Sequence, residues 1–489
     1  METLNTLMPI LCASGVALFL LLLSVFTKLK SSTFSLISSI SLTFFFLYPI
    51  LNIINSQGKS APKALLTFDR IGVFFSLIFF FATIFTLIIL PDYLEKKNSS
   101  HINEVYPLVV FSFVGMVILA TANHFLMFFL GLELMSINFY ILCGILREQE
   151  YAVESSLKYF ILGVISSAIL LLGIGLIYGS TSSLKYKNIA EVLSEDLFNY
   201  GEPILLLGFV LLLVGLFFKL SLVPFHFWAP DVYQGAPTPI TALLSVGGKA
   251  AAVAATIRIY SEVVQYSVLL SQKWLILFAV IGLITIFVGS FIALTQSQFK
   301  RLLAYSSIVH AGFLALGISA LAGKGEFLAR GILALSFYVA AYLFMNVASF
   351  AVAVAVEKTY SMDESLLVFS GLGTSSPLFA ALFSINLLSL AGIPLTAGFL
   401  GKFYIFSDIV LQGSKFFYYL AALGLIGAVI ATFYYLKVLV ILYFPNKNQQ
   451  PADLPKISPS VWVVLIVCSI LTIYFGVFPQ FILKISTLF

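Results

Sequence analysis

Long apolar runs, separated by short polar segments, repeat along almost the whole chain. A helix needs about 20 predominantly apolar residues to cross the hydrocarbon core of a bilayer, and fourteen runs approach or exceed that length. We therefore predict an all-α polytopic membrane protein with about fourteen transmembrane helices. The predicted helices fall near residues 8–27, 34–54, 71–90, 106–121, 123–145, 156–178, 203–224, 241–261, 273–295, 302–321, 329–356, 377–412, 416–443 and 461–483.

Two of these runs combine a proline with a nearby lysine. In the first, Pro224 follows Lys219 by five residues; the second, 377–412, is too long for one straight crossing and contains Pro394 before Lys402. Proline removes a backbone hydrogen bond and leaves a carbonyl free in an apolar helix. Interrupted segments at matching places in two halves are typical of transporters built from inverted repeats. We predict two broken helices.

The composition agrees with a membrane location. Hydrophobic residues make up 61% of the chain and charged residues 10%, whereas about a quarter of a soluble domain is charged. A β-barrel would show short alternating segments, and here the apolar runs are continuous. The net charge of +5 is small and scattered over loops, so it does not indicate a nucleic-acid partner.

The sequence shows no pattern for a metal, nucleotide or flavin site. Cys12, Cys143 and Cys468 stand alone within apolar runs, without the pairs that hold zinc or an iron–sulfur cluster. The glycines of 173–179 lie in an apolar helix and lack the strand context of a dinucleotide loop. We therefore expect no cofactor in this chain, and an energy source that is an ion gradient or lies in another chain.

Among the ionisable residues inside the predicted helices, the strongest candidates for function are Glu133, Lys219, Lys249 and Lys402. A charge inside the membrane costs at least a few kcal/mol and commonly marks an ion path. We predict that Glu133 and Lys219 form an ion pair. Such a pair is compatible with a purely structural role and with a switch that opens, and both interpretations can hold together.

Histidines are weaker candidates. His226 and His310 are possible proton carriers between the lysines, because histidine titrates near neutral pH. The alternative for His226 is a hydrogen bond to backbone freed by Pro224. Lys300 and Arg301 are interpreted as interfacial anchors, and the same default of reaching towards the interface applies to Arg258.

Several stretches together resemble the proton-translocating, antiporter-like membrane subunits of respiratory complex I. The segment PDVYQGAPTP is most similar to the N-type subunits. The resemblance covers roughly residues 105–440. It rests on the stretches FKLSLVPFHFWAPDVYQGAPTPITALLSVGGKAA, LKYFILGVISSAILLLGIGLIYG, FKRLLAYSSIVHAGFLALG and SLAGIPLTAGFLGKF.

The resemblance implies two inverted five-helix repeats and a chain of buried charges and water along the bilayer midplane. It also implies a bacterial inner membrane with the N-terminus on the periplasmic side. The expected divisions are N-terminal helices in 1–104, the first repeat in 105–262, the second repeat in 272–443 and a last helix in 460–489.

The family's functional positions carry over to this sequence by its motifs. Glu133 matches the acidic residue of the fifth helix and Lys219 the lysine of the broken seventh helix. Lys249 matches the connecting lysine of the eighth helix and Lys402 the lysine of the broken twelfth. His310 falls in the stretch that links the two halves. Some sister subunits carry glutamate in place of Lys402, so this lysine favours the N-type.

The expected function is proton translocation in an NADH–quinone oxidoreductase, coupled to quinone reduction elsewhere in the complex. The chain would be a subunit of that enzyme without a redox site of its own. NAD, FMN, iron–sulfur clusters and quinone are expected in partner subunits, and the partners would include sister antiporter-like subunits and small membrane subunits. The alternatives are a Mrp-type sodium/proton antiporter subunit, a membrane-bound hydrogenase arm, and a structural scaffold that moves no ions.

Overall fold

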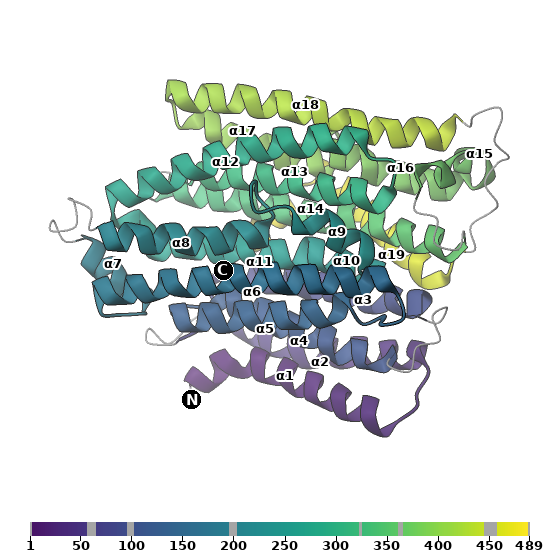
Figure 1. The fold of residues 1–489 in the computed structure, drawn as a ribbon, viewed down its shortest axis with the longest axis horizontal. Helices are drawn as coiled ribbons and strands as arrows, with labels where there is room; N and C mark the ends of the chain where they lie inside the picture. The colour runs from purple at the N-terminus through teal and green to yellow at the C-terminus, as the bar shows by residue number, and fades with distance from the viewer. Residues whose placement is uncertain are drawn as a thin grey trace.

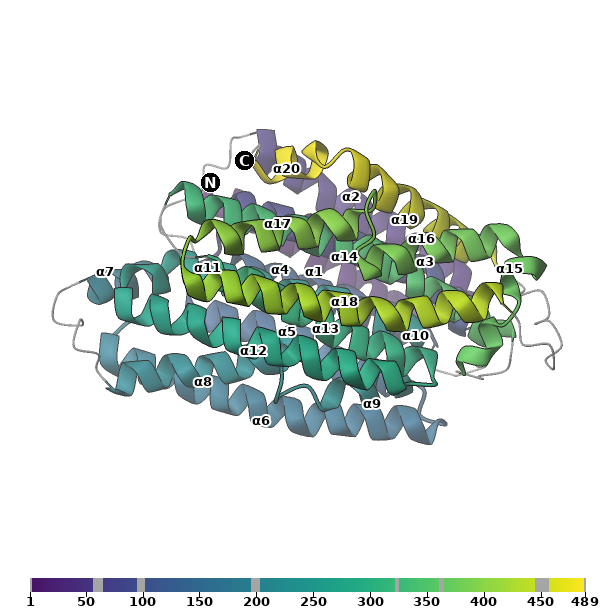
Figure 2. The same ribbon diagram turned by 90° about the horizontal axis from the view of Figure 1, so that it is seen from above.

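Long helices dominate the fold and lie side by side with their axes in roughly one direction (Figure 1, Figure 2). The structure, a computed structural model, describes residues 2–55, 65–94, 102–194, 203–321, 325–359, 365–444 and 457–487. Among these residues, β-pairing is limited to isolated bridges, one of which joins Leu66 to Ala122. The bundle is therefore held together by helix packing.

The helices carry the labels of Figure 1. The chain begins with α1 (Glu2–Phe26), α2 (Ser31–Asn55) and α3 (Arg70–Leu94). The next group comprises η2 (Ile102–Glu104), α4 (Val105–Thr121), α5 (Phe125–Cys143), α6 (Glu150–Thr181), α7 (Tyr186–Ser194), α8 (Pro203–Leu220), α9 (Trp228–Gly235), α10 (Thr238–Leu243), η4 (Leu244–Gly248), α11 (Lys249–Glu262) and η5 (Val264–Tyr266). The last group comprises α12 (Val268–Thr295), α13 (Phe299–Ser319), α14 (Glu326–Thr359), η6 (Leu366–Phe369), α15 (Leu372–Ser375), α16 (Pro377–Ala391), α17 (Ala397–Leu411), α18 (Lys415–Tyr443), α19 (Pro459–Val477) and α20 (Gln480–Thr487).

Twelve helical segments of the described chain are long and apolar enough to cross a membrane. Of the shorter helices, α4 has 17 residues and α16 and α17 have 15 each, below the roughly 20 of a full crossing. Together, these helices occupy all fourteen apolar runs that the sequence contains. The prediction of an all-α polytopic membrane protein is confirmed.

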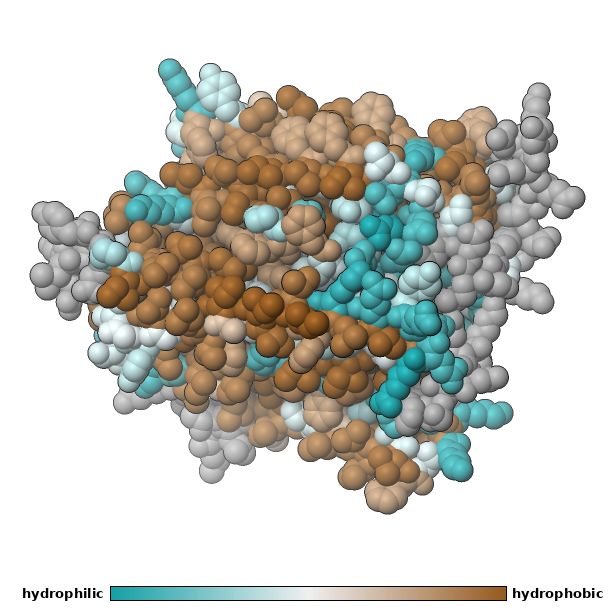
Figure 3. All heavy atoms as spheres, in the orientation of Figure 1, coloured by the Kyte–Doolittle hydropathy of each residue, from teal (hydrophilic) through white to brown (hydrophobic). Residues whose placement is uncertain are grey.

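The outer face of the bundle is largely apolar, as Figure 3 shows over α6, α8, α12 and α18. Large apolar side chains stay exposed there, among them Leu172 on α6 and Val429 on α18. Contiguous apolar surface of this extent marks contact with lipid or with other membrane helices. The protein is therefore an integral membrane protein.

Glycines allow several helix pairs to approach closely. On α4, a Cβ added to Gly115 would lie 2.4 Å from the backbone nitrogen of Met135 on α5. On α6, a Cβ added to Gly173 would lie 2.6 Å from the carbonyl oxygen of Gly208 on α8. Small residues at such crossings are the usual basis of helix association in membranes, because lipid tails are as apolar as the side chains.

Both predicted broken helices are present. The α8–α9 break spans residues 221–227 and contains Pro224. The α16–α17 break spans residues 392–396 and contains Pro394; Gly392 at its start has a φ of 89°. Each break interrupts the helix beside one of the buried lysines and leaves backbone groups free to bind side chains.

Candidate functional site

Lys219 lies in the last turn of α8, directly before the first break. Its ammonium donates hydrogen bonds to Ser136 Oγ at 2.7 Å and to Tyr140 OH at 3.3 Å, both on α5. The side chain is 5% exposed, so these hydroxyls replace water as its polar partners. Neither Ser136 nor Tyr140 was among the residues predicted for this site.

Glu133 and Lys219 do not form the predicted ion pair by direct contact in this structure, although the carboxylate still attracts the ammonium through space. Glu133 Oε1 is buried and has no hydrogen-bond partner. Ser136 and Tyr140 follow Glu133 by three and seven residues on α5, so all three share one face of the helix. The lysine side chain is directed towards the later positions on this face. The spacing of Ser136 and Tyr140 from Glu133 was a signal visible in the sequence.

Lys249 is the first residue of α11 and follows the π-helical turn η4. Its ammonium donates to the carbonyl oxygen of Ser307 at 2.7 Å and contacts the Ser307 hydroxyl as well. The Tyr233 hydroxyl lies 3.1 Å from the same Ser307 Oγ. Lys249, on α11, therefore contacts α13. Gly247 and Gly248 lie in this turn, and π-turns recur at functional sites.

His310 on α13 lies between two tyrosine hydroxyls. Its Nδ1 is 2.6 Å from Tyr338 OH on α14, and its Nε2 is 3.1 Å from Tyr435 OH on α18. The ring also packs against Tyr342, with the centroids 4.9 Å apart. Tyr435 OH continues to Ser306 Oγ by a further hydrogen bond. Both ring nitrogens of His310 thus have partners that can donate or accept.

Lys402 lies on α17, just after the second break. Its ammonium donates to the carbonyl oxygens of Leu390 at 2.9 Å and Ala391 at 2.8 Å, the last two residues of α16. A helix C-terminus presents free carbonyls and a partial negative charge. Lys402 therefore caps the C-terminus of α16 with its ammonium group. The side chain is only 6% exposed, so these carbonyls take the place of water.

His226 lies in the first break, apart from the other candidates. Its Nδ1 is buried without a hydrogen-bond partner, and its ring packs on Phe227 at a centroid distance of 4.4 Å. Among the hydrogen bonds of the described residues, none joins it to Lys219 or Lys249. The structure brings His310 into a polar network and leaves His226 outside it.

Lys300 is not the interfacial anchor that the sequence suggested. It is 4% exposed, lies 3.5 Å from Glu357 Oε1 and donates to the carbonyl oxygen of Ala236. Thr238 Oγ1 donates to the same carboxylate, at 2.7 and 2.8 Å from its two oxygens. The partner Glu357 comes from the far end of α14, which explains why local sequence did not reveal the pair.

Arg258 is also more buried than predicted. Its guanidinium forms an ion pair with Asp69 at 2.5 Å and donates to the carbonyl oxygen of Ala120 at 2.8 Å. The side chain joins α11 to the residue that precedes α3 and to the last turn of α4. Arg258 is therefore buried against Asp69 and does not extend to the membrane interface as predicted. We assign this arginine a structural role.

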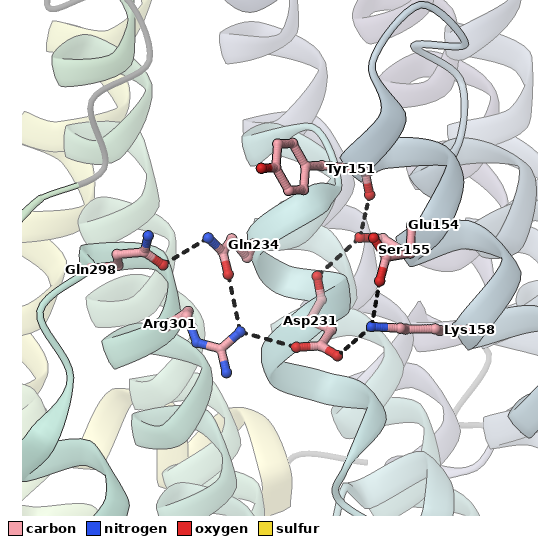
Figure 4. A network of polar contacts seen from close by, with 8 residues as sticks. All are labelled: Tyr151, Glu154, Ser155, Lys158, Asp231, Gln234, Gln298 and Arg301. Carbon is pink, nitrogen blue, oxygen red and sulfur yellow. Dashed lines mark hydrogen bonds and ion pairs between the residues drawn. The ribbon is translucent and has the colours of Figure 1, made fainter.

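A polar cluster joins α9 to α6 and α13, as Figure 4 shows. The carboxylate of Asp231 lies 2.9 Å from Lys158 Nζ and 3.0 Å from Arg301 Nη1. The Arg301 guanidinium also donates to Gln234 Oε1 at 3.0 Å. Asp231 and Lys158 are partly exposed, and Figure 3 shows a hydrophilic band on this face of the molecule, beside α9. This cluster lies at the edge of the buried network.

The family described as NADH:quinone oxidoreductase/Mrp antiporter, TM, matches residues 122–431, a segment that contains Glu133, Lys219, Lys249, His310 and Lys402. The chain belongs to this family. The predicted relationship to antiporter-like subunits is confirmed. In the part of the chain that the structure describes, no three histidine, cysteine or carboxylate side chains are grouped to hold a metal ion.

Curated relatives of the family cover nearly the whole chain. One, named NADH-quinone oxidoreductase subunit N, from Trichlorobacter lovleyi, is 36% identical over 487 residues, which are 99% of this chain and 96% of the relative. A subunit N 2 from Rhizobium meliloti is 38% identical over 88% of this chain and 86% of its own length. These relatives place the chain among the N-type members.

Solved structures show the same fold. A chain of respiratory complex I from Thermus thermophilus with bound aureothin aligns with a TM-score of 0.79 and 29% identity, covering 98% of this chain and 99% of that one. A chain of an archaeal membrane-bound sulfane sulfur reductase aligns with a TM-score of 0.84 and 24% identity, covering 99% and 96%. The second likeness concerns the fold alone.

Proposed function

We propose that this chain is a proton-translocating N-type subunit of an NADH–quinone oxidoreductase in a bacterial inner membrane, with a periplasmic N-terminus. The observation that carries the proposal is the series of three buried lysines. Lys219, Lys249 and Lys402 are 5%, 2% and 6% exposed, and among the described residues none forms an ion pair. Their partners are hydroxyls and carbonyl oxygens.

Unpaired buried lysines suit proton transfer for a physical reason. Removal from water disfavours the charged form of an amine, and none of these three ammonium groups is in direct contact with a carboxylate that would offset this cost. A lysine in such surroundings can exchange its proton, whereas an arginine stays charged. A purely structural scaffold has no need for three such groups, because apolar side chains would fill the same space at lower cost.

The proposed route follows the contacts between helices. A proton held at Lys219 passes to Lys249, whose ammonium contacts Ser307 on α13. One helical turn further along α13, His310 and its two tyrosine partners continue the path. Lys402 lies beyond, with its Nζ 5.0 Å from the centre of the Phe313 ring on α13. Water would bridge the steps that these direct contacts leave open.

The energy would come from outside this chain. Quinone reduction in partner subunits would shift the equilibrium between two arrangements of the buried groups. NAD, FMN, iron–sulfur clusters and quinone would bind those partners, and the neighbours would be sister antiporter-like subunits and small membrane subunits. The names of the curated relatives and their coverage of the chain support this assignment.

The test is Lys219→Ala in the assembled complex. Inside-out membrane vesicles report NADH-driven acidification, and NADH oxidase activity and complex assembly are measured beside it. We expect an assembled complex in which pumping through this subunit is lost. Lys415→Ala, which removes an exposed lysine at the start of α18, is the matched control and should pump normally.

Two results would contradict the proposal. Full pumping by Lys219→Ala would reduce the buried lysine to a structural group. Acidification independent of NADH in the unmodified protein would favour the Mrp-type antiporter, a function that the description of the matching family also includes.

A further inference from the structure

Three residues on one face of α5 define two different positions for the Lys219 ammonium. Glu133 offers a carboxylate, and Ser136 and Tyr140 offer hydroxyls one and two turns further along. In this structure the ammonium occupies the hydroxyl position. Glu133 Oε1, buried and without a hydrogen-bond partner, remains able to accept a hydrogen bond.

Aromatic rings complete the hydroxyl position. Lys219 Nζ lies 5.4 Å from the ring centre of Tyr140, 5.6 Å from that of Tyr159 and 5.5 Å from that of Phe218. Ring faces attract a cation within about 6 Å, most strongly where water is excluded. The ammonium is thus in contact with two neutral hydroxyls and three rings, and with no carboxylate.

A second layer holds these rings in place. Trp228 stacks on Tyr159 with the ring centres 4.5 Å apart, and its Nε1 donates to the carbonyl oxygen of Phe218 at 3.0 Å. Tyr140 packs edge-on against Tyr159 at 4.7 Å. Residues from α5, α6, α8 and α9 therefore build this site before the lysine enters it, which lowers the cost of binding.

Gly163 on α6 makes room for the phenol of Tyr140. A Cβ added at this glycine would lie 2.0 Å from Tyr140 OH and 2.6 Å from its Cζ. Any larger residue would move the hydroxyl away from Lys219. Gly175, on the same helix, has open space where its Cβ would be. Of these two glycines on α6, only Gly163 is needed to leave space for Tyr140.

We propose that Ser136, Tyr140 and the surrounding rings, with the space left by Gly163, form a second docking site for the Lys219 ammonium. The flexible four-carbon stem of lysine lets the group move between Glu133 and this site. In contact with Glu133, the amine and its proton are stabilised strongly by the carboxylate; at the hydroxyl site the carboxylate acts only through space and therefore more weakly. Ser136 and Tyr140 are positioning residues that decide where Lys219 can release its proton.

The docking site rests on the contacts above, and only its role in proton release depends on the proposed function. The experiment is a structure of the complete complex carrying Ser136→Ala together with Tyr140→Phe, combined with vesicle acidification. Loss of hydrogen bonds to a charged group should shift Lys219 towards Glu133 roughly tenfold or more. The Nζ atom should then lie within about 4 Å of the carboxylate.

The two measurements separate the two proposals. Lys219 remaining away from Glu133 in the double variant would overturn the docking site. Lys219 moving to Glu133 with unchanged pumping would uphold the docking site and contradict the role of Lys219 in translocation. Lys219 moving together with a loss of pumping supports both. Tyr178→Phe, which removes an exposed phenol on α6, controls for the loss of a tyrosine hydroxyl.

A single substitution that removes no polar group tests the docking site if the double variant does not assemble. Gly163→Ala retains every polar group and should displace the Tyr140 phenol, so it should lower pumping while Gly175→Ala leaves it unchanged. Equal pumping by the two alanine variants, with Tyr140 and Lys219 in their original places, would show that the space at Gly163 does not matter and overturn the site as proposed.

Discussion

The two broken helices hold their lysines in different ways. Lys219 precedes its break and binds side chains of α5, hydroxyls that belong to another helix. Lys402 follows its break and binds main-chain carbonyls of Leu390 and Ala391, at the end of the helix half that the break itself creates. Both lysines are buried, and both lack an ion pair among the described residues.

The difference concerns how easily each lysine can move. The carbonyls that bind Lys402 are fixed by the α16 helix, and their partial charge adds to the attraction. The partners of Lys219 are side chains, and the half-buried Glu133, whose Oε1 has no hydrogen-bond partner, lies on the same face of α5. At the first break, Lys219 can therefore move between two positions. At the second break, Lys402 is held in one position, from which it would release its proton.

The largest expected effect comes from Lys402→Arg. Arginine keeps the positive charge and can still donate to the α16 carbonyls, but it does not release a proton. We expect normal assembly and thermal stability with proton pumping lost. Lys402→Met should lose pumping and also roughly 1.5 to 3 kcal/mol of stability, because a charge-assisted cap disappears. Vesicle acidification and thermal unfolding of the purified complex measure both quantities.

Normal pumping by Lys402→Arg would mean that Lys402 only caps α16. The comparison between a switching break and a proton-releasing break would then fail, since the second lysine would be structural.

An intermediate effect is expected from Gly392→Ala. Gly392 has a φ of 89°, and an added Cβ would lie 3.0 Å from both Cδ and Nζ of Lys402. The backbone conformation should cost about 1 to 2 kcal/mol for alanine, and the crowding should displace the ammonium. We expect lower thermal stability of the complex and a partial loss of pumping.

Gly413→Ala is the matched control for the backbone cost. Gly413 has a φ of 73° and nothing within 4 Å of its added Cβ. It should lower stability by a similar amount and leave pumping unchanged. Equal losses of pumping in the two variants would attribute the effect to helix strain and remove the role of the Lys402 contact.

The smallest effect is expected from Asp231→Asn, outside both buried sites. The ion pairs of Asp231 with Lys158 and Arg301 are partly exposed, and such pairs contribute about 1 kcal/mol or less. We expect the midpoint of thermal unfolding to fall by about 2 °C or less in a chain of this size, with pumping retained. Glu154→Gln, which removes only an exposed pair with Lys158, should change less still.

A large loss of pumping in an assembled Asp231→Asn complex would contradict this ranking. It would place the α6–α9–α13 cluster of Figure 4 on the functional path, and the contrast between the two breaks would no longer describe the whole site.

Much of the fold was predictable because it depends on local properties of the chain. The apolar runs located the helices, and proline and glycine located both breaks. The positions of Lys219 and Lys402 beside those breaks were visible as well. The division into 1–104, 105–262, 272–443 and 460–489 stays a prediction, as does the periplasmic N-terminus.

The sequence did not predict which side chains on different helices contact one another. The predicted direct contact between Glu133 and Lys219 is not formed in this structure because other residues on the same face of α5 compete for the lysine, and a long side chain can reach any of them. Lys300 and Arg258 were placed at the interface because their carboxylate partners, Glu357 and Asp69, lie far away in the sequence.

The sequence by itself determined that this protein spans a membrane, where its helices break and which charges enter the apolar interior. These features follow from hydrophobic length and backbone chemistry, which neighbouring residues set. Only the tertiary structure decided that Lys219 faces hydroxyls and rings while Lys402 faces a helix end. The rotation of each helix about its axis and the packing of glycines against neighbours set those contacts, and a single run of residues does not contain that information.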